Sequence, residues 1–195
     1  KEWVKVKLGK GSPSKGEPHT KVTLYQGIPK SSKMDFVIQK CVELGVYKIV
    51  PLETARTITD LSDPKRANKR VARWQRISLE AAKQSKRGII PGVDMPRSFS
   101  HVIKTATHST KIIFWEGEQA VDLKKYLDEK ILSKENKDKD IGIIIGPEGG
   151  LDDQEVLLAR EHEWDTITLG PRILRTETAG MAALAAIMFY MEEME

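Results

Sequence analysis

Apolar positions along the chain alternate between short continuous runs and one-faced helical patterns. Short runs predict buried strands, and apolar residues spaced like Met34, Val37, Ile38, Cys41 and Leu44 predict a helix that buries one side. The predicted strands are residues 22–25, 47–50, 111–115, 141–145 and 166–169, with a further short strand at 56–59. The predicted helices are residues 30–44, 64–86, 99–104, 121–131, 151–160 and 176–194. This order predicts an α/β fold with a mostly parallel sheet and helices on both faces.

Two of these predicted strands end in the same way. The run 141–145 leads into Gly-Pro at 146–147, and the run 166–169 leads into Gly-Pro at 170–171. Proline lacks a backbone N–H group and stops a strand ladder, so each loop leaves peptide groups available at the carboxyl edge of the sheet. Ligands of open α/β sheets bind at that edge. We therefore expect a ligand site at these loops, with the end of strand 111–115 beside them.

Several common kinds of site are absent from the sequence. Neither loop has the spacing of a phosphate-binding loop or a dinucleotide fingerprint, which disfavours a nucleotide hydrolase. Cys41 is the single cysteine, and no Cys/His cluster has zinc spacing, so we expect a small core residue and no metal. The longest apolar segment, 181–191, is too short to span a bilayer, and no signal peptide opens the chain. We expect a cytoplasmic protein with no membrane partner.

Positive charge is concentrated in one predicted helix. The whole chain carries a net charge of +4, which permits a nucleic-acid partner without requiring one. Residues 65–87, however, contain nine basic residues and one acidic residue. Solvation explains any single lysine, whereas phosphate binding explains the whole run better. The candidates for RNA contact are Lys69, Arg73, Arg76, Gln84 and Arg87.

The last predicted helix is apolar around most of its surface. Its small residues allow another helix to approach closely: Ala179, Gly180, Ala182, Ala183, Ala185 and Ala186. Core packing accounts for one face. A second apolar face predicts a homodimer through this helix, and we expect Ala183 and Ala186 at the contact.

The two loops resemble the carboxy-terminal signature of the RsmE family, SPOUT-class methyltransferases that act on N3 of a uridine in small-subunit ribosomal RNA. The resemblance runs from about residue 22 to the end, through residues 33–40, 43–46, 51–52, 73–75, 81–87, 145–150 and 169–179. It implies a SPOUT-type trefoil knot near the carboxyl end. Periodicity alone would argue against a knot, because knotted chains are rare. It also implies S-adenosylmethionine (SAM) as the cofactor.

SPOUT enzymes hold SAM in a bent shape among the loops of the knot. The implied cofactor contacts are Trp115, Glu116, Gly117, Ile145, Gly146, Gly150, Leu169, Gly170, Ile173 and Leu174. Glycines let the backbone approach the ligand, and Leu169, Ile173 and Leu174 can enclose a purine. Taken singly, Gly146 and Gly150 are better explained by a tight turn.

Methylation of uridine N3 requires loss of its proton, and negative charge then spreads onto the flanking carbonyl oxygens. A cation near those oxygens favours the reaction. Arg175 is the first candidate for this role and Arg172 the second, with an ion pair to Glu148 or Glu177 as an equal alternative for either. Glu177 could serve as the general base, although we favour a helix-capping role.

The resemblance also sets the expected domains and partners. RsmE proteins carry an amino-terminal PUA-like RNA-binding barrel, and residues 1–18 resemble its last strand and a breaker-rich linker. Residues 19–195 would form the methyltransferase domain, acting on small-subunit ribosomal RNA or the assembled subunit. The alternative that stays open is a non-catalytic RNA-binding or ribosome-assembly module that uses the basic helix 65–87.

Overall fold

The computed structural model describes residues 3–7, 9, 11, 14, 16–118, 121–130 and 140–194. Its strands are β1 (Lys21–Gly27), β2 (Lys48–Glu53), β3 (Gly92–Val93), β4 (Arg97–Ser98), β5 (Thr110–Phe114), β6 (Asp140–Ile145) and β7 (Asp165–Ile167). Its helices are α1 (Lys33–Glu43), α2 (Pro64–Gln84), α3 (Phe99–Thr105), α4 (Leu123–Lys130), α5 (Asp153–Glu161) and α6 (Thr176–Tyr190). The predicted end of the fourth helix at Ile131 lies outside the described residues.

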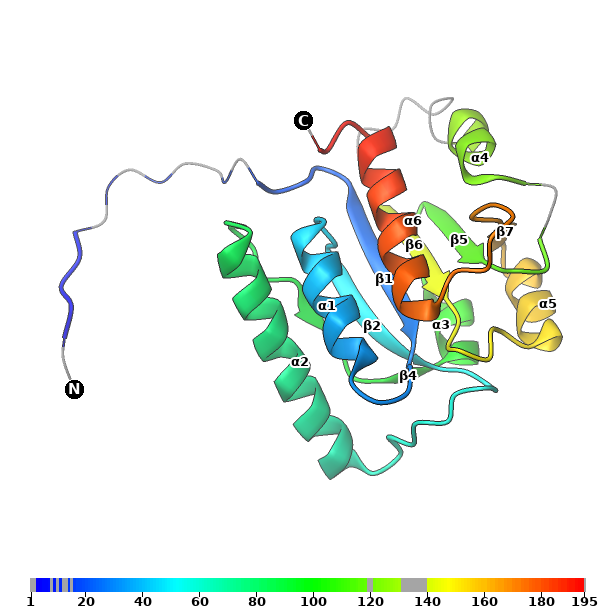
Figure 1. Cartoon of the computed structure of the whole chain (residues 1–195), viewed down its shortest axis with the longest axis horizontal. Helices are drawn as coiled ribbons and strands as arrows, with labels where there is room; N and C mark the ends of the chain where they lie inside the picture. The colour runs from blue at the N-terminus through cyan, green and yellow to red at the C-terminus, as the bar shows by residue number, and fades with distance from the viewer. Residues whose placement is uncertain are drawn as a thin grey trace.

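The seven strands form one sheet in the order β3-β2-β1-β6-β5-β7, with β4 also paired to β2. All the strand pairs are parallel, which confirms the predicted α/β class. Residues of α1, α2, α4 and α6 pack into one core, and residues of α3 and α5 into another, so helices cover both faces. Figure 1 shows α1, α2 and α6 in front of the sheet. The trefoil knot stays a prediction, because strand order does not establish how the chain threads.

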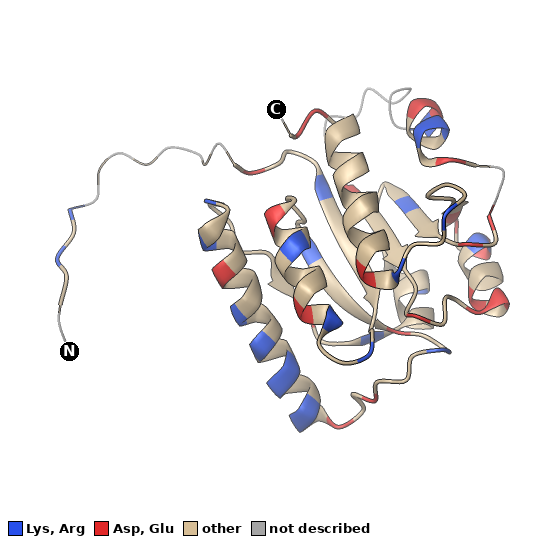
Figure 2. Ribbon diagram, in the orientation of Figure 1, with Lys and Arg blue, Asp and Glu red and all other residues tan. Residues whose placement is uncertain are grey.

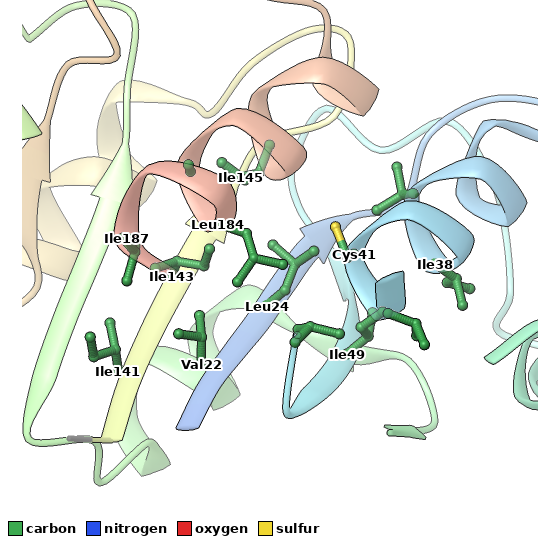
Figure 3. Packing of buried hydrophobic residues seen from close by; sticks show 14 of the residues in the cluster. Val22, Leu24, Ile38, Cys41, Ile49, Ile141, Ile143, Ile145, Leu184 and Ile187 are labelled. Atoms are coloured by element: carbon green, nitrogen blue, oxygen red, sulfur yellow. The ribbon is translucent and has the colours of Figure 1, made fainter. Parts of the chain in front are cut away.

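The larger core forms where α1 and α6 cross the central strands β1 and β6. Figure 3 shows Leu24 of β1 and Ile143 of β6 beneath Leu184 of α6, and all three side chains are fully buried. Cys41 of α1 is buried in the same core, and burial raises the pKa of its thiol to about 12. The prediction that Cys41 is a small core residue is confirmed.

The predicted strand at residues 56–59 is wrong. The chain turns there instead: the Thr57 N–H donates to the Thr54 carbonyl at 3.0 Å, and the Thr54 N–H donates to the Thr57 hydroxyl at 3.0 Å. Threonine side chains can bond to nearby backbone in this way and so compete with strand pairing. The β-branched residues that suggested a strand form a turn at the end of β2.

Helix α2 ends at Gln84, two residues before its predicted end at residue 86. Lys86 takes the left-handed conformation with φ of 59°, and the Arg87 N–H donates to the Ala82 carbonyl at 2.9 Å. This hydrogen bond between residues five positions apart ends the helix as in a Schellman motif. Lys86 takes the left-handed position, where glycine is more common.

Arg87 is not available to RNA. Its side chain is 4% exposed, and its guanidinium donates to the carbonyls of Val42 and Val46 at 3.1 and 2.7 Å. The same group pairs with Glu17 at 2.9 Å. Burial raises the pKa of the Glu17 carboxyl, but the bonds from Arg87 and from backbone N–H groups leave that pKa below its ordinary value. The predicted RNA contact is therefore wrong for Arg87, which anchors residue 17 to the domain.

Helix α6 has one buried and one open face. Ala183 and Ile187 are fully buried in the core, whereas Ala186 is exposed and Phe189 is 78% exposed. Ala183 therefore cannot lie at a dimer contact as expected, but Ala186 can. None of the helices in the described part of the chain, α6 included, is long and apolar enough to cross a membrane.

Candidate functional site

Three loops at the carboxyl edge of the sheet enclose a cavity of about 830 Å³. They follow β5, β6 and β7, which the parallel pairing places side by side. Nine of the ten residues assigned to the cofactor line this cavity: Trp115, Glu116, Ile145, Gly146, Gly150, Leu169, Gly170, Ile173 and Leu174. Residues not predicted also line it: Lys33, Phe114, Glu118, Pro147, Glu148, Leu151, Thr168, Pro171, Thr176 and Ala179.

Gly117, the tenth residue, does not line the cavity and instead makes room for Trp115. A Cβ atom at position 117 would lie 2.4 Å from the indole ring of Trp115. The guanidinium of Arg160 lies over the indole ring of Trp115, 5.6 Å from the ring centre. Arg160 also forms an ion pair with Glu118 at 3.2 Å. A cation over an aromatic face is attractive. Gly117 and Arg160 therefore hold Trp115 in place at the cavity.

The loop after β6 is tight as well as part of the lining. The Gly150 N–H donates to the Pro147 carbonyl at 2.9 Å, and Gly150 has a positive φ of 69°, a conformation that glycine adopts without strain. A Cβ atom at Gly146 would lie 3.0 Å from the Gly150 carbonyl carbon. The turn explanation for both glycines is correct, and the same turn places their backbone at the cavity.

The turn after β2 forms hydrogen bonds with the loop after β6 and with the start of α5. Arg56 donates to the Gly149 carbonyl at 2.8 Å, and the Ala55 N–H donates to Glu155 at 2.8 Å. Glu155 also completes the capping box of α5 with Asp152. The residues mistaken for a strand therefore position the loop between β6 and α5.

A buried hydrogen-bond chain joins the end of β1, the start of α6 and the loop after β6. The Gln26 side-chain amide donates to the Thr176 hydroxyl at 2.9 Å, and that hydroxyl donates to the Gly146 carbonyl at 2.6 Å. Gln26 is fully buried and Thr176 is 6% exposed. Sequence reasoning missed this chain, although a glutamine in an otherwise apolar strand is the signal that could have revealed it.

Lys33, at the start of α1, connects two acidic residues beside the cavity. Its ammonium lies 3.0 Å from Glu148 Oε1 and 3.3 Å from Glu177 Oε2, and the hydrogen bond that Lys33 donates to Glu148 raises the pKa of Lys33. Burial raises the pKa of Glu148, but Lys33 and the backbone N–H of Lys30 leave it below its ordinary value. The expected capping role of Glu177 is wrong, because α6 has Arg175 at its N-cap with no side-chain cap bond.

Arg172 and Arg175 both line the cavity and are exposed. Neither side chain has an ion pair or hydrogen bond within the described residues. The two carboxylates considered as partners, those of Glu148 and Glu177, pair with Lys33 instead. The alternative of an ion pair to Glu148 or Glu177 is therefore wrong for both arginines. Two guanidinium groups remain available at the cavity, while Glu177 lies next to the lining residue Thr176.

The lining suits an organic ligand. It combines apolar side chains with glycine backbone at the ends of parallel strands, as in sites for small molecules that carry a planar ring. In the portion of the chain that the structure describes, no group of three or more His, Cys, Asp or Glu residues could hold a metal ion.

Comparison with protein families gives the same assignment as the geometry. Residues 16–188 match the family model of the RNA methyltransferase domain. The chain therefore contains an RNA methyltransferase domain, with its cavity at the carboxyl edge of the sheet. The chain is 38% identical over 172 residues to ribosomal RNA small subunit methyltransferase E of Bacillus subtilis, covering 88% of this chain and 67% of that protein. The chain belongs to the ribosomal RNA small subunit methyltransferase E (RsmE) family.

Solved structures support this membership. The family member from Neisseria gonorrhoeae, bound to SAM, matches with a TM-score of 0.77 and 37% identity over 89% of this chain and 68% of that one. A methyltransferase from Legionella pneumophila with bound SAM matches with a TM-score of 0.80 and 33% identity, covering 89% and 68% of the two chains.

Replacing Thr176 with valine should destabilise the protein. The change keeps the shape of the side chain but removes the hydroxyl that connects Gln26 to Gly146. Buried polar groups without partners cost about 1–3 kcal/mol, so we expect the free energy of unfolding to fall by about 2 kcal/mol. Urea denaturation measures this difference.

Thr178→Val is the matched control, because Thr178 is exposed two residues further along the same helix. It should change stability by less than about 0.5 kcal/mol. Equal stability of the two variants would show that the hydrogen-bond chain has no stabilising role.

Proposed function

We propose that this chain transfers a methyl group from SAM to N3 of a uridine in small-subunit ribosomal RNA. Family membership supports the reaction class, and the names of the relatives specify ribosomal RNA of the small subunit. The observation that carries the proposal is the cavity, because three separate loops bring nine of the ten expected cofactor residues to one place.

The cavity residues fit SAM. A volume of about 830 Å³ is within the range of small-molecule sites. Leu169 and Leu174 offer apolar surface to the adenine ring, and the backbone of Gly146 offers polar groups to the rest of the cofactor. When bound, the cofactor supplies a methyl group on a sulfonium and leaves as a neutral thioether. Ile173, which is 83% exposed, becomes buried against the ligand.

The arginines act on the uridine. N3 must lose its proton to a base, for which Glu177 is the candidate, and the negative charge then spreads to O2 and O4. The lone pair on N3 bonds to the methyl carbon as the bond from that carbon to sulfur breaks. Arg175 donates hydrogen bonds to one of these oxygens, and Arg172 is the second candidate. A preorganised donor of this kind stabilises charge that develops in the transition state. Lys33 lies between Glu148 and Glu177, and neither arginine forms an ion pair with these carboxylates.

The alternative is a non-catalytic RNA-binding module that uses α2. The cavity favours the enzyme, since RNA binding through α2 alone gives no reason for three loops to form a cofactor-sized site. Calorimetric titration with SAM, ATP and GTP in parallel distinguishes the methyltransferase from the non-catalytic module. Binding of SAM alone supports the enzyme, and no binding of SAM supports the module.

Gly146→Val should abolish SAM binding. A Cβ atom there would lie 3.0 Å from the Gly150 carbonyl carbon, so the loop must shift and the branched side chain must enter the site. Calorimetry should detect no SAM binding to the folded variant. Gly92→Val is the control, because no atom lies within 4 Å of a Cβ at that position in β3. Unchanged affinity in folded Gly146→Val would refute the proposed site.

We also propose that α6 forms a homodimer through the face that includes Ala186 and Phe189. Ala186→Glu should dissociate the dimer, since it buries an unpaired charge at the contact. Light scattering with size-exclusion chromatography should give the mass of one chain for this variant and of two chains for the unmutated protein. Ala72→Glu, on the exposed face of α2, should leave the dimer intact. A monomeric unmutated protein would disprove the dimer.

Arg175→Ala and Arg175→Lys should both slow methyl transfer. Alanine removes the charge and the hydrogen-bond donors, and lysine keeps the charge but loses the planar fork. Loss of a preorganised donor typically costs about 100-fold or more in rate, which we expect for alanine. Single-turnover methylation of small-subunit ribosomal RNA measures the rate, and SAM affinity is measured in parallel.

The two measurements distinguish the possible roles of Arg175. A slower rate with unchanged SAM affinity places Arg175 on the uridine. If affinity falls together with rate, Arg175 holds the cofactor instead. A normal rate for Arg175→Ala would remove this residue from the mechanism.

A further inference from the structure

The first half of α2 carries a line of basic residues on one face. Arg66, Lys69, Arg73 and Arg76 follow one another at intervals of three or four residues, so their side chains project from the same side of the helix. All four are exposed. We call these four residues the basic stripe.

The basic stripe has few partners within the protein. No hydrogen bond or ion pair involves the side chains of Arg66, Lys69 or Arg76 in the ranges that the structure describes. Arg73 pairs with Asp35 yet remains 66% exposed. Farther along α2, Lys83 pairs with Glu80, as is usual for surface charges on a helix.

Stability does not account for cations at this position. The amino-terminal end of a helix is electrically positive, so acidic residues are favourable there and basic residues are unfavourable. The first turn of α2 contains no acid, and the acids near this end of the described helix are the N-cap Asp63 and Asp60, which interacts with Arg66. A helix selected for stability would carry its cations at the other end. Helix stability therefore does not explain Arg66, which lies in the first turn of α2.

The basic stripe lies on the same side of the molecule as the cavity. Figure 1 shows the middle of α2 beside the start of α1, and Figure 2 shows basic residues along the first half of α2 and at the start of α1. The pair between Arg73 and Asp35 connects the stripe to the first turn of α1. That turn also contains Lys33, which lines the cavity. The first turn of α1 thus lies between the stripe and the mouth of the cavity.

The length of the stripe suits several phosphates. From residue 66 to residue 76 a helix rises about 15 Å, since each residue adds about 1.5 Å. In a double helix each strand carries one phosphate per roughly 3.4 Å of the helix axis, so at most about four phosphates of one strand lie along the stripe. Four cations at this spacing match the phosphates in number.

We propose that Arg66, Lys69, Arg73 and Arg76 bind the phosphate backbone of the RNA whose uridine enters the cavity. The identity of that RNA rests on the proposed function, whereas the phosphate contacts do not. The contacts are made to the backbone, so they position the strand without reading its sequence. The start of α1 then carries the strand from α2 to the arginines at the cavity. Gln84, at the far end of α2, lies outside this stripe and takes no part.

The triple variant Arg66→Ala, Lys69→Ala and Arg76→Ala tests the proposal without removing any ion pair. The probe is a fluorescein-labelled single-stranded RNA of mixed sequence, and its affinity is measured over a series of salt concentrations. Each lost phosphate contact lowers the slope of log affinity against log salt by about 0.7, so the variant should lose about two units of slope. The control variant Lys104→Ala, Lys124→Ala and Lys125→Ala removes the same charge from α3 and α4 and should keep the slope.

Thermal unfolding provides a second readout. Alanine is a better helix former than the residues it replaces, and it removes cations from the positive end of α2, so the triple variant should keep or raise its melting temperature. Lower RNA affinity in an equally or more stable protein supports the proposal. An unchanged slope, or a lower melting temperature with an unchanged slope, overturns it. Stripe-dependent binding to phosphatidylserine vesicles without RNA binding also overturns it.

The proposed function can fail separately. If the unmutated chain shows stripe-dependent RNA binding but no methyl transfer, the phosphate contacts stand and the reaction is wrong. If the triple variant methylates and binds RNA with the salt dependence of the unmutated chain, the reaction stands and the stripe is wrong. SAM affinity should be the same in the unmutated chain and both triple variants.

Discussion

One hydroxyl group connects the parts from which the site is built. Thr176 accepts a hydrogen bond from Gln26 and donates one to the Gly146 carbonyl, so the start of α6, the end of β1 and the loop after β6 keep a fixed arrangement. Because these groups are buried, none of them can exchange its partner for water without cost. The apolar core brings the elements together, but dispersion forces have no direction. The hydrogen bonds supply the direction and so determine where the loop backbone faces the cavity.

The sequence predicts the parts of this architecture that depend on local pattern. Buried parallel strands are continuous apolar runs, so β1, β2, β5, β6 and β7 could be located, and the Gly-Pro pairs after β6 and β7 identified the ligand edge. What could not be predicted depends on contacts distant in sequence. The turn after β2 is fixed partly by Glu155, and Arg87 looked like one more surface cation until the fold enclosed it with Glu17.

Charged groups near the cavity divide into two sets with different roles. Lys33 lies between Glu148 and Glu177, and its two ion pairs connect these residues beside the cavity. Arg172 and Arg175 have no such partners within the described residues. Sequence alone left an ion pair with Glu148 or Glu177 as an equal alternative for either arginine. Position 33 is distant in sequence but adjacent in space, and it leaves the arginines available to a substrate.

The burial of Cys41 gives the protein an internal indicator of unfolding. With its thiol pKa raised to about 12, this cysteine has almost no thiolate at neutral pH, and its sulfur lies beneath α1 without access to solvent. Thiol reagents should therefore leave the native chain unlabelled and modify it only when the core opens. Since the chain contains one cysteine, the rate of labelling would report a single event, the separation of α1 from the central strands.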